Sequence, residues 1–159
     1  MGDDAFSKQF LETIAVSYTV ASALITDPDD RVLLVKPHYR DDWLFVGGMV
    51  DKGESPHEGC AREIKEEIGL ALPVGDLLLV DFIPQVPQIV DEPLTMYLFD
   101  GGVLDDPSRI RLQEEELADF GFFDLDEAAE RAAYFNRPRI ALGLEARRTG
   151  RAVYEPFTR

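Results

Sequence analysis

Runs of apolar and β-branched residues recur along the chain and alternate with polar, turn-forming clusters. The runs cover residues 13–25, 31–36, 77–83, 94–100 and 117–123. Their length and composition predict β-strands, and Asp27-Pro28-Asp29-Asp30 predicts the turn between the first two. Helical signals mark three other segments, at 56–68, about 125–134 and about 137–149, the last ending at Gly150. This order predicts one α/β domain over residues 1–159, with a mixed sheet and helices on its faces.

The segment 56–68 carries the clearest local signals. Ser55 suits a helix N-cap, Pro56 suits the first helical position, and Glu58 completes a capping box. Gly69 supplies the left-handed residue at which helices often end. Because both ends are specified, we predict a short helix whose backbone is firmly held.

The faces of this predicted helix differ in chemistry. Helical spacing places Cys60, Ala61, Ile64 and Ile68 on one side, which we expect to pack on the sheet. It places Glu63, Glu66 and Glu67 together on another side, with Arg62 and Lys65 around the far side of this acidic stripe. Like charges at that spacing repel each other. A solvated acidic face is the ordinary explanation of such a stripe, and an ion-binding face is the alternative.

The glycine-rich segment before the helix favours the ion-binding alternative. Gly47, Gly48 and Gly53 could bring backbone carbonyl groups beside the three carboxylates. Oxygen ligands of this kind suit hard cations, so the pattern predicts a site for Mg²⁺ or Mn²⁺. His38 and His57 are isolated and are expected at the surface or in loops.

Charge and composition limit the partners. With 31 acidic against 16 basic residues, the formal net charge is −15. This balance argues against a nucleic-acid polymer or an anionic membrane surface as the partner. No apolar run reaches membrane-spanning length, and the first residues lack the features of a secretory signal, so a cytoplasmic location is expected. An anionic substrate would therefore need bound cations to reverse the local field.

Residues 48–70 resemble the signature of the Nudix hydrolase family. That signature specifies a Gly, a Glu, and then Arg-Glu-aliphatic-x-Glu-Glu-x-Gly-aliphatic at fixed spacing. The matching residues are Gly48, Glu54, Arg62, Glu63, Ile64, Glu66, Glu67, Gly69 and Leu70, without a mismatch. The preceding WLFVGG is similar to the family's Trp-x-x-Pro-Gly-Gly, with Val46 in place of Pro. The resemblance implies a Nudix-type α/β/α sandwich with a mixed β-sheet.

The resemblance also implies roles for individual residues. Glu63, Glu66 and Glu67, with the Gly48 carbonyl, would bind the metal, and Glu54 and Arg62 would form a supporting ion pair. A further acidic residue late in the domain is expected, and the run at 114–116 offers Glu116, with Glu115 as the alternative. Glu66, Glu67 and Glu116 are the candidate catalytic residues. A homodimer is a family-based expectation.

The implied reaction is hydrolysis of a diphosphate linkage in a nucleoside diphosphate joined to another moiety, such as a nucleotide, an oxidised nucleotide or a nucleotide sugar like ADP-ribose. Arg40, Phe45 and Phe82 are candidate substrate contacts, although aromatic residues more often fill cores. Arg137, Arg139, Arg147 and Arg148 are expected on a solvated helix face. A catalytically silent nucleotide sensor is the alternative function. An isopentenyl diphosphate isomerase would need a catalytic Cys, and Cys60 is expected to be buried.

Overall fold

The computed structural model describes residues 6–85 and 90–156. In chain order its elements are α1 (Lys8–Leu11), β1 (Tyr18–Thr26), β2 (Val32–Pro37), β3 (Val46–Met49), α2 (Pro56–Ile68), β4 (Leu77–Ile83), β5 (Leu94–Val103), η1 (Pro107–Arg109), β6 (Leu117–Phe123), α3 (Leu125–Arg131), α4 (Arg137–Thr149) and β7 (Val153–Pro156). The predicted bounds of α2, α4, β4 and β6 are confirmed. The short elements α1, β3, η1 and β7 were not predicted.

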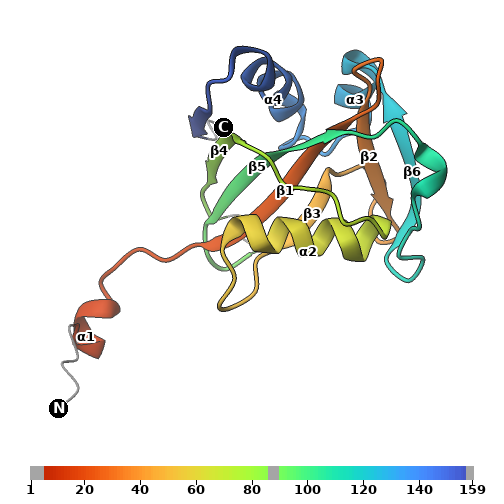
Figure 1. Cartoon of the computed structure of the whole chain (residues 1–159). Coiled ribbons are helices and arrows are strands. Elements are labelled where there is room, and N and C mark those ends of the chain that lie inside the picture. The colour runs from red at the N-terminus through yellow and green to blue at the C-terminus, as the bar shows by residue number, and fades with distance from the viewer. Residues whose placement is uncertain (1–5, 86–89, 157–159) are drawn as a thin grey trace.

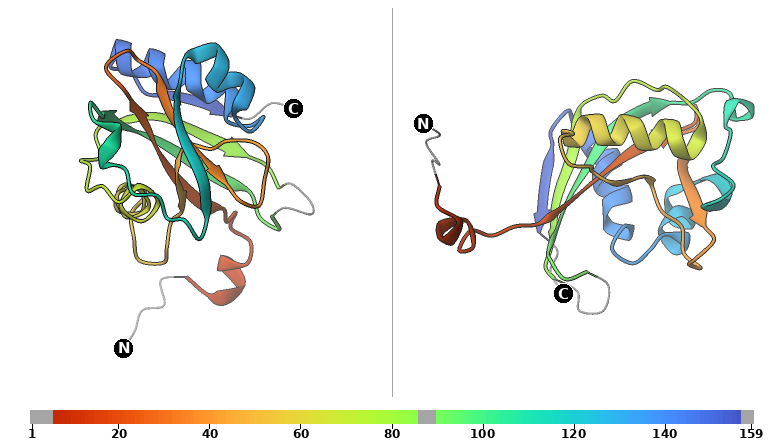
Figure 2. Two further views of the ribbon diagram at one scale, coloured as in Figure 1. Left: turned by 90° about the vertical axis from the view of Figure 1, so that its right-hand side faces the viewer. Right: turned by 90° about the horizontal axis from the view of Figure 1, so that it is seen from below.

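The strands form one mixed sheet between two helical layers (Figures 1 and 2). Their order is β6-β2-β1-β5-β4-β7, with β3 paired to β1. β1 runs parallel to β5 and antiparallel to β3. Helix α2 covers one face over a core that includes Ile25, Val35 and Ile64, while α3 and α4 cover the other over Leu24, Leu34 and Ile140. The predicted α/β/α sandwich is confirmed.

The start of β1 differs from the prediction. The strand begins at Tyr18, whereas the apolar run begins at residue 13. Residues 6–17 are exposed, and with α1 they extend away from the body of the domain (Figure 1). An apolar run becomes a strand only where a neighbouring strand accepts its hydrogen bonds, and the pairing with β5 begins at Tyr18.

Helix α2 is held at both ends as predicted. The Ser55 side chain accepts a hydrogen bond from the Glu58 backbone N–H, and the Glu58 carboxylate accepts one from the Ser55 N–H at 2.8 Å. Gly69 ends the helix with φ of 70°. Cys60, Ile64 and Ile68 are fully buried against the sheet, which fixes how the helix is rotated. This rotation of α2 in turn sets where its acidic residues, Glu63, Glu66 and Glu67, point.

Strand β3 brings the glycine-rich segment against β1. Gly47 pairs with Ser22, and Gly48 pairs with Ala21. Gly47 has φ of 145°, and a Cβ there would lie 2.4 Å from the Ala21 carbonyl oxygen. Only glycine permits this approach. Strand propensity is low for glycine, which is why no strand was predicted here.

Helix α3 ends at Arg131, earlier than the predicted residue 134. Ala132 is extended and forms a parallel bridge with Trp43. The Ala133 backbone N–H donates to the Trp43 carbonyl at 3.0 Å. The residues at 134–136 therefore form a turn before α4.

The expectation for the C-terminal arginines was wrong for two of the four. Arg139 is only 2% exposed, and its guanidinium donates to Asp81 on β4. Arg147 donates to the Asp100 carboxylate and to the Leu24 carbonyl, so it ties α4 to the sheet. These partners are distant in sequence and could not be identified from the helix alone.

Candidate active site

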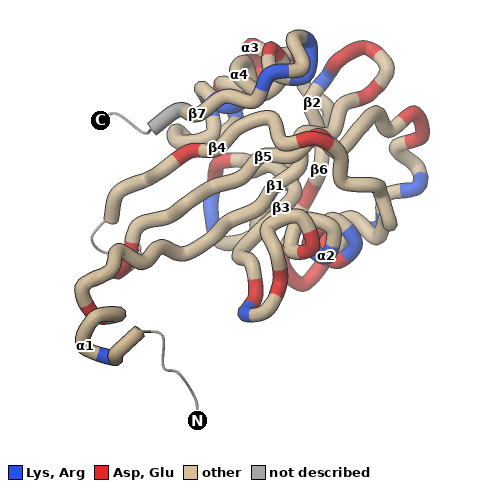
Figure 3. The backbone as a smooth tube through the Cα atoms, turned by 60° about the vertical axis from the view of Figure 1, so that its left-hand side comes forward, with Lys and Arg blue, Asp and Glu red and all other residues tan. Residues whose placement is uncertain are grey.

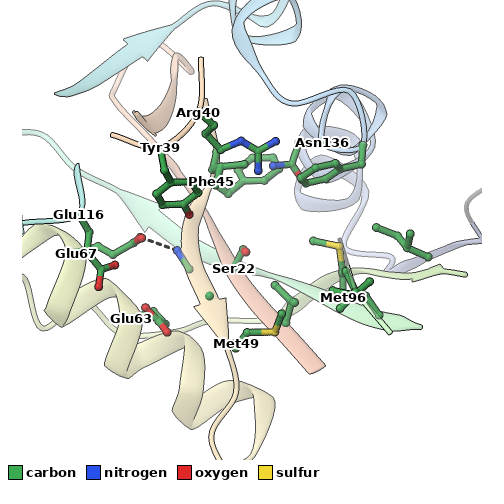
Figure 4. Close-up of a pocket in the computed structure, with 18 of the residues that line it drawn as sticks. Ser22, Tyr39, Arg40, Phe45, Met49, Glu63, Glu67, Met96, Glu116 and Asn136 are labelled. Atoms are coloured by element: carbon green, nitrogen blue, oxygen red, sulfur yellow. Dashed lines mark hydrogen bonds between the residues drawn. The ribbon is translucent and has the colours of Figure 1, made fainter. Parts of the chain in front are cut away.

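One cavity of about 440 Å³ contains most of the predicted site residues. Glu63 and Glu67 of α2, Gly48 of β3 and Glu116 line it together. In Figure 4 Glu63, Glu67 and Glu116 lie on one side of the cavity, while Arg40, Phe45 and Asn136 lie on another. Glu116, just before β6, joins the α2 residues because the Gln113 backbone N–H donates to the Glu67 carbonyl at 3.0 Å. The placement thus supports Glu116 as a member of the site.

Glu67 is the most enclosed of the acidic residues that line the cavity, at 8% exposure. Its Oε2 accepts a hydrogen bond from the Gly47 backbone N–H at 2.8 Å, drawn as a dashed line in Figure 4. Burial raises the pKa of Glu67 to about 8, and the nearby negative charges of Glu63 and Glu116 add to this effect. The carboxylate is therefore held in place but lacks a countercharge.

Glu63 is packed against the glycine of β3. A Cβ at position 48 would lie 2.6 Å from Glu63 Oε1, so a glycine there leaves room for the carboxylate. Burial raises the pKa of Glu63, against the lowering effect of Arg62. Gly48 of the signature is thus required sterically, because any side chain at this position would collide with the Glu63 carboxylate.

Arg62 connects the loop before α2 to the acidic side of the helix. Its Nε donates to Glu54 Oε1 at 2.8 Å, and its Nη1 donates to Glu63 at 2.9 Å and to Glu66 at 3.0 Å. Nη2 also donates to the Met49 carbonyl. The hydrogen bond from Arg62 lowers the pKa of Glu54. The expectation that Arg62 lies around the far side of the stripe was wrong, because its long side chain turns back to the carboxylates.

Glu66 occupies a different position from the other two acidic residues of the stripe. Its side chain is 49% exposed and pairs with Arg62, and it is not among the described residues that line the cavity. Within residues 6–85 and 90–156, no three His, Cys, Asp or Glu side chains surround one point in a geometry that would hold a metal ion. Arg62 holds Glu63 and Glu66 instead.

The donor chemistry nevertheless fits a hard divalent cation. Glu63, Glu67 and Glu116 supply only carboxylate oxygens, and their mutual repulsion contributes to the raised pKa of Glu67. A divalent cation would relieve that repulsion. Glu66 would be available once it left Arg62.

The predicted substrate contacts have different positions. Arg40 and Phe45 line the cavity, whereas Phe82 does not and is 38% exposed. Successive side chains of a strand point to opposite faces, and the neighbouring Ile83 lines the cavity instead. The Arg40 guanidinium pairs with Asp42.

Several cavity residues were not identified from the sequence. Phe135 and Asn136 come from the turn between α3 and α4, and Met96 comes from β5. The Arg40 guanidinium lies 5.5 Å from the centre of the Phe135 ring. The sequence around Asn136 contains Arg137, Pro138 and Arg139. This pattern indicates the start of a helix, and it gives no indication that Asn136 lines a cavity.

Cys60 of α2 is fully buried against the sheet, and the cavity lining does not include it. Burial raises the pKa of its thiol to about 12. A neutral, enclosed thiol cannot serve as an acid or nucleophile in the cavity. This placement opposes an isomerase mechanism that depends on a catalytic Cys.

The fold and the cavity together define an α/β sandwich with an acidic ligand site beside a capped helix. The sequence matches the NUDIX domain family over residues 17–142. The chain therefore belongs to the Nudix hydrolase family. No helix in the part of the chain that the structure describes has the length and apolar character to cross a membrane.

Individual relatives cover the chain to different extents. The chain is 33% identical over 113 residues to an RNA pyrophosphohydrolase from a Nitratiruptor species, with 62% of this chain and 68% of that protein covered. It is 38% identical over 84 residues to a protein named octanoyltransferase from Myxococcus xanthus, covering 46% of this chain but 23% of that protein. A crystal structure of a UDP-X diphosphatase superposes with a TM-score of 0.71 at 26% identity, covering 96% of this chain and 70% of that chain.

Proposed function

We propose that this protein is a divalent-metal-dependent hydrolase that cleaves the diphosphate linkage of a nucleoside diphosphate joined to another moiety. The observation that carries the proposal is the shared cavity, in which Glu63, Glu67 and Glu116 face the same space as Arg40 and Phe45. Carboxylates suit the cation that a diphosphate requires, and the aromatic part suits a nucleoside. Relatives named pyrophosphohydrolase and diphosphatase support the reaction class.

In this proposal Glu63 and Glu67 hold Mg²⁺ or Mn²⁺, with Glu66 and the Gly48 carbonyl as further ligands. When bound, the metal neutralises phosphate oxygens and lowers the pKa of the attacking water. Glu116 takes the water's proton, since it reaches the cavity from outside α2 and makes no ion pair with Arg62. The water oxygen bonds to phosphorus as the bridging oxygen leaves with its electron pair. Glu54 and Arg62 hold the loop against the helix and thereby orient the ligands.

A small molecule is the proposed substrate, and not a nucleic-acid polymer. Acidic residues outnumber basic ones by 31 to 16, and Figure 3 shows them spread over many loops as well as α2. A long polyanion would be repelled by such a surface, whereas a short one could reach the cavity. The relative named RNA pyrophosphohydrolase makes a 5′-triphosphorylated RNA the necessary comparison substrate. The homodimer and the cytoplasmic location stay predictions.

The test is a panel of nucleoside triphosphates, nucleotide sugars and the RNA, assayed with Mg²⁺, with Mn²⁺ and with EDTA. We expect metal-dependent release of phosphate or monophosphate products from at least one small nucleotide, and loss of activity in Glu67→Gln. The exposed Lys65→Gln on the same helix is the matched control and should remain active. Turnover that survives both EDTA and Glu67→Gln refutes the mechanism. Tight nucleotide binding without turnover would instead establish the catalytically silent sensor.

A further inference from the structure

A buried ion pair contacts the cavity lining through Asn136. Arg139 of α4 and Asp81 of β4 are 2% and 3% exposed, and the Arg139 Nε donates to Asp81 Oδ2 at 2.8 Å. The proposed reaction does not use either residue. Buried charged pairs contribute little net stability compared with apolar residues of the same volume. Stability alone therefore does not explain why Arg139 and Asp81 occupy these buried positions.

The same guanidinium also holds the side chain of Asn136. Arg139 Nη1 donates to Asn136 Oδ1 at 2.8 Å. A guanidinium has donors only, so the end of the amide that faces it must be the oxygen. Asn136 stands at the N-cap of α4, yet its side chain makes no capping hydrogen bond there. The side chain is therefore directed by Arg139 and not by the helix end.

The other end of this amide faces the cavity. Asn136 is 3% exposed and lines the cavity. Among the described residues its Nδ2 donates no hydrogen bond, and Nδ2 is not one of the fully enclosed atoms that lack a partner. Both N–H groups are thus available to a ligand. Figure 4 shows Asn136 beside Arg40 and Phe45, away from Glu63 and Glu67.

We propose that Arg139, held by Asp81, is a positioning residue that fixes the Asn136 amide with its donors toward the cavity. The cavity thereby selects a planar group that presents a hydrogen-bond acceptor, such as a nucleobase carbonyl, over one that presents an amino group. A group with a donor at this place would leave its own donor and the amide donors unpaired. This inference rests on the proposed function only in assuming that a nucleotide occupies the cavity.

The first test compares matched nucleotides by isothermal titration calorimetry. Uridine and inosine monophosphates carry a carbonyl where cytidine and adenosine monophosphates carry an amino group. The wild-type protein should bind the carbonyl member of at least one pair about tenfold more tightly than the amino member. This is the usual difference between forming one neutral hydrogen bond and leaving its buried donor unpaired. Asn136→Asp keeps one oxygen on Arg139 and turns the other into the cavity, so the preference within that pair should reverse. Equal ratios in the two proteins, or no binding of any of the four, overturn the proposal.

The second test addresses the ion pair. The double variant Asp81→Leu, Arg139→Met replaces the buried charges together and frees the Asn136 amide to rotate, so the preference should fall to within about twofold. Ile140→Val, in the core of the same helix, is the control for a merely structural effect and should keep the wild-type ratio. A double variant that keeps the ratio would refute the positioning role. A preserved preference in a protein that hydrolyses no nucleotide would refute the proposed reaction and leave this inference standing.

Discussion

Removing only one partner of the Asp81–Arg139 pair should strongly destabilise the protein. In Arg139→Met the Asp81 carboxylate keeps its enclosed position but loses its charge partner, and its Oδ1 already has no hydrogen bond. Breaking a buried pair from one side costs about 3–5 kcal/mol. For a domain of this size each kcal/mol lowers the melting temperature by about 2–4 °C. We therefore expect a melting temperature roughly 6–20 °C below that of the wild type.

Urea unfolding followed by the fluorescence of Trp43 measures this loss. Trp43 is the only tryptophan and is 8% exposed, so its emission should report on the packed core. The double variant Asp81→Leu, Arg139→Met should recover most of the stability, because no charge is left buried. Arg148→Met removes an exposed arginine from the same helix and should leave the midpoint unchanged. A loss below about 1 kcal/mol in Arg139→Met, or a double variant no more stable than Arg139→Met, would refute the reasoning.

Three further predictions concern Glu67 and Glu63. Glu67 has its folded-state pKa raised to about 8 by burial, so at pH 7 metal binding should release a proton, and affinity should rise up to about tenfold per unit toward pH 8. Calorimetry in buffers of different ionisation enthalpy measures this release, and its absence at pH 7 would contradict the assignment. The raised pKa of Glu67 also makes the stability of the metal-free protein depend on pH. The stability that protonated Glu67 contributes is present below its unfolded pKa and is lost as pH rises through about 8. The metal-free Glu67→Gln protein should therefore have a higher melting temperature than the wild type at pH 9. Gly48→Ala places a methyl group 2.6 Å from Glu63 Oε1 and should weaken metal binding about tenfold by displacing that carboxylate, whereas unchanged metal affinity would exclude the steric role.

The sequence alone determined the parts whose interactions are local. Helix α2 needs only Ser55, Glu58 and Gly69 to set its ends, and all three act within a few residues of their own positions. Helical periodicity then separates Ile64 and Ile68 from Glu63 and Glu67. The contacts of Arg62 could not be predicted from helical periodicity, because its long side chain can reach several acidic residues.

The tertiary structure decided which distant residues share the cavity. Glu116 lies beside the α2 carboxylates because the segment before β6 forms a backbone hydrogen bond with α2. Asn136 lines the cavity because α3 ends where Ala132 forms a bridge with Trp43. Arg139 is buried because Asp81, on another element, supplies its charge partner. None of these contacts has a periodic or nearest-neighbour signal, since each depends on where the sheet places two segments that the chain keeps apart. The sequence therefore specified the acidic helix, and the packed sheet specified the ligand cavity around it.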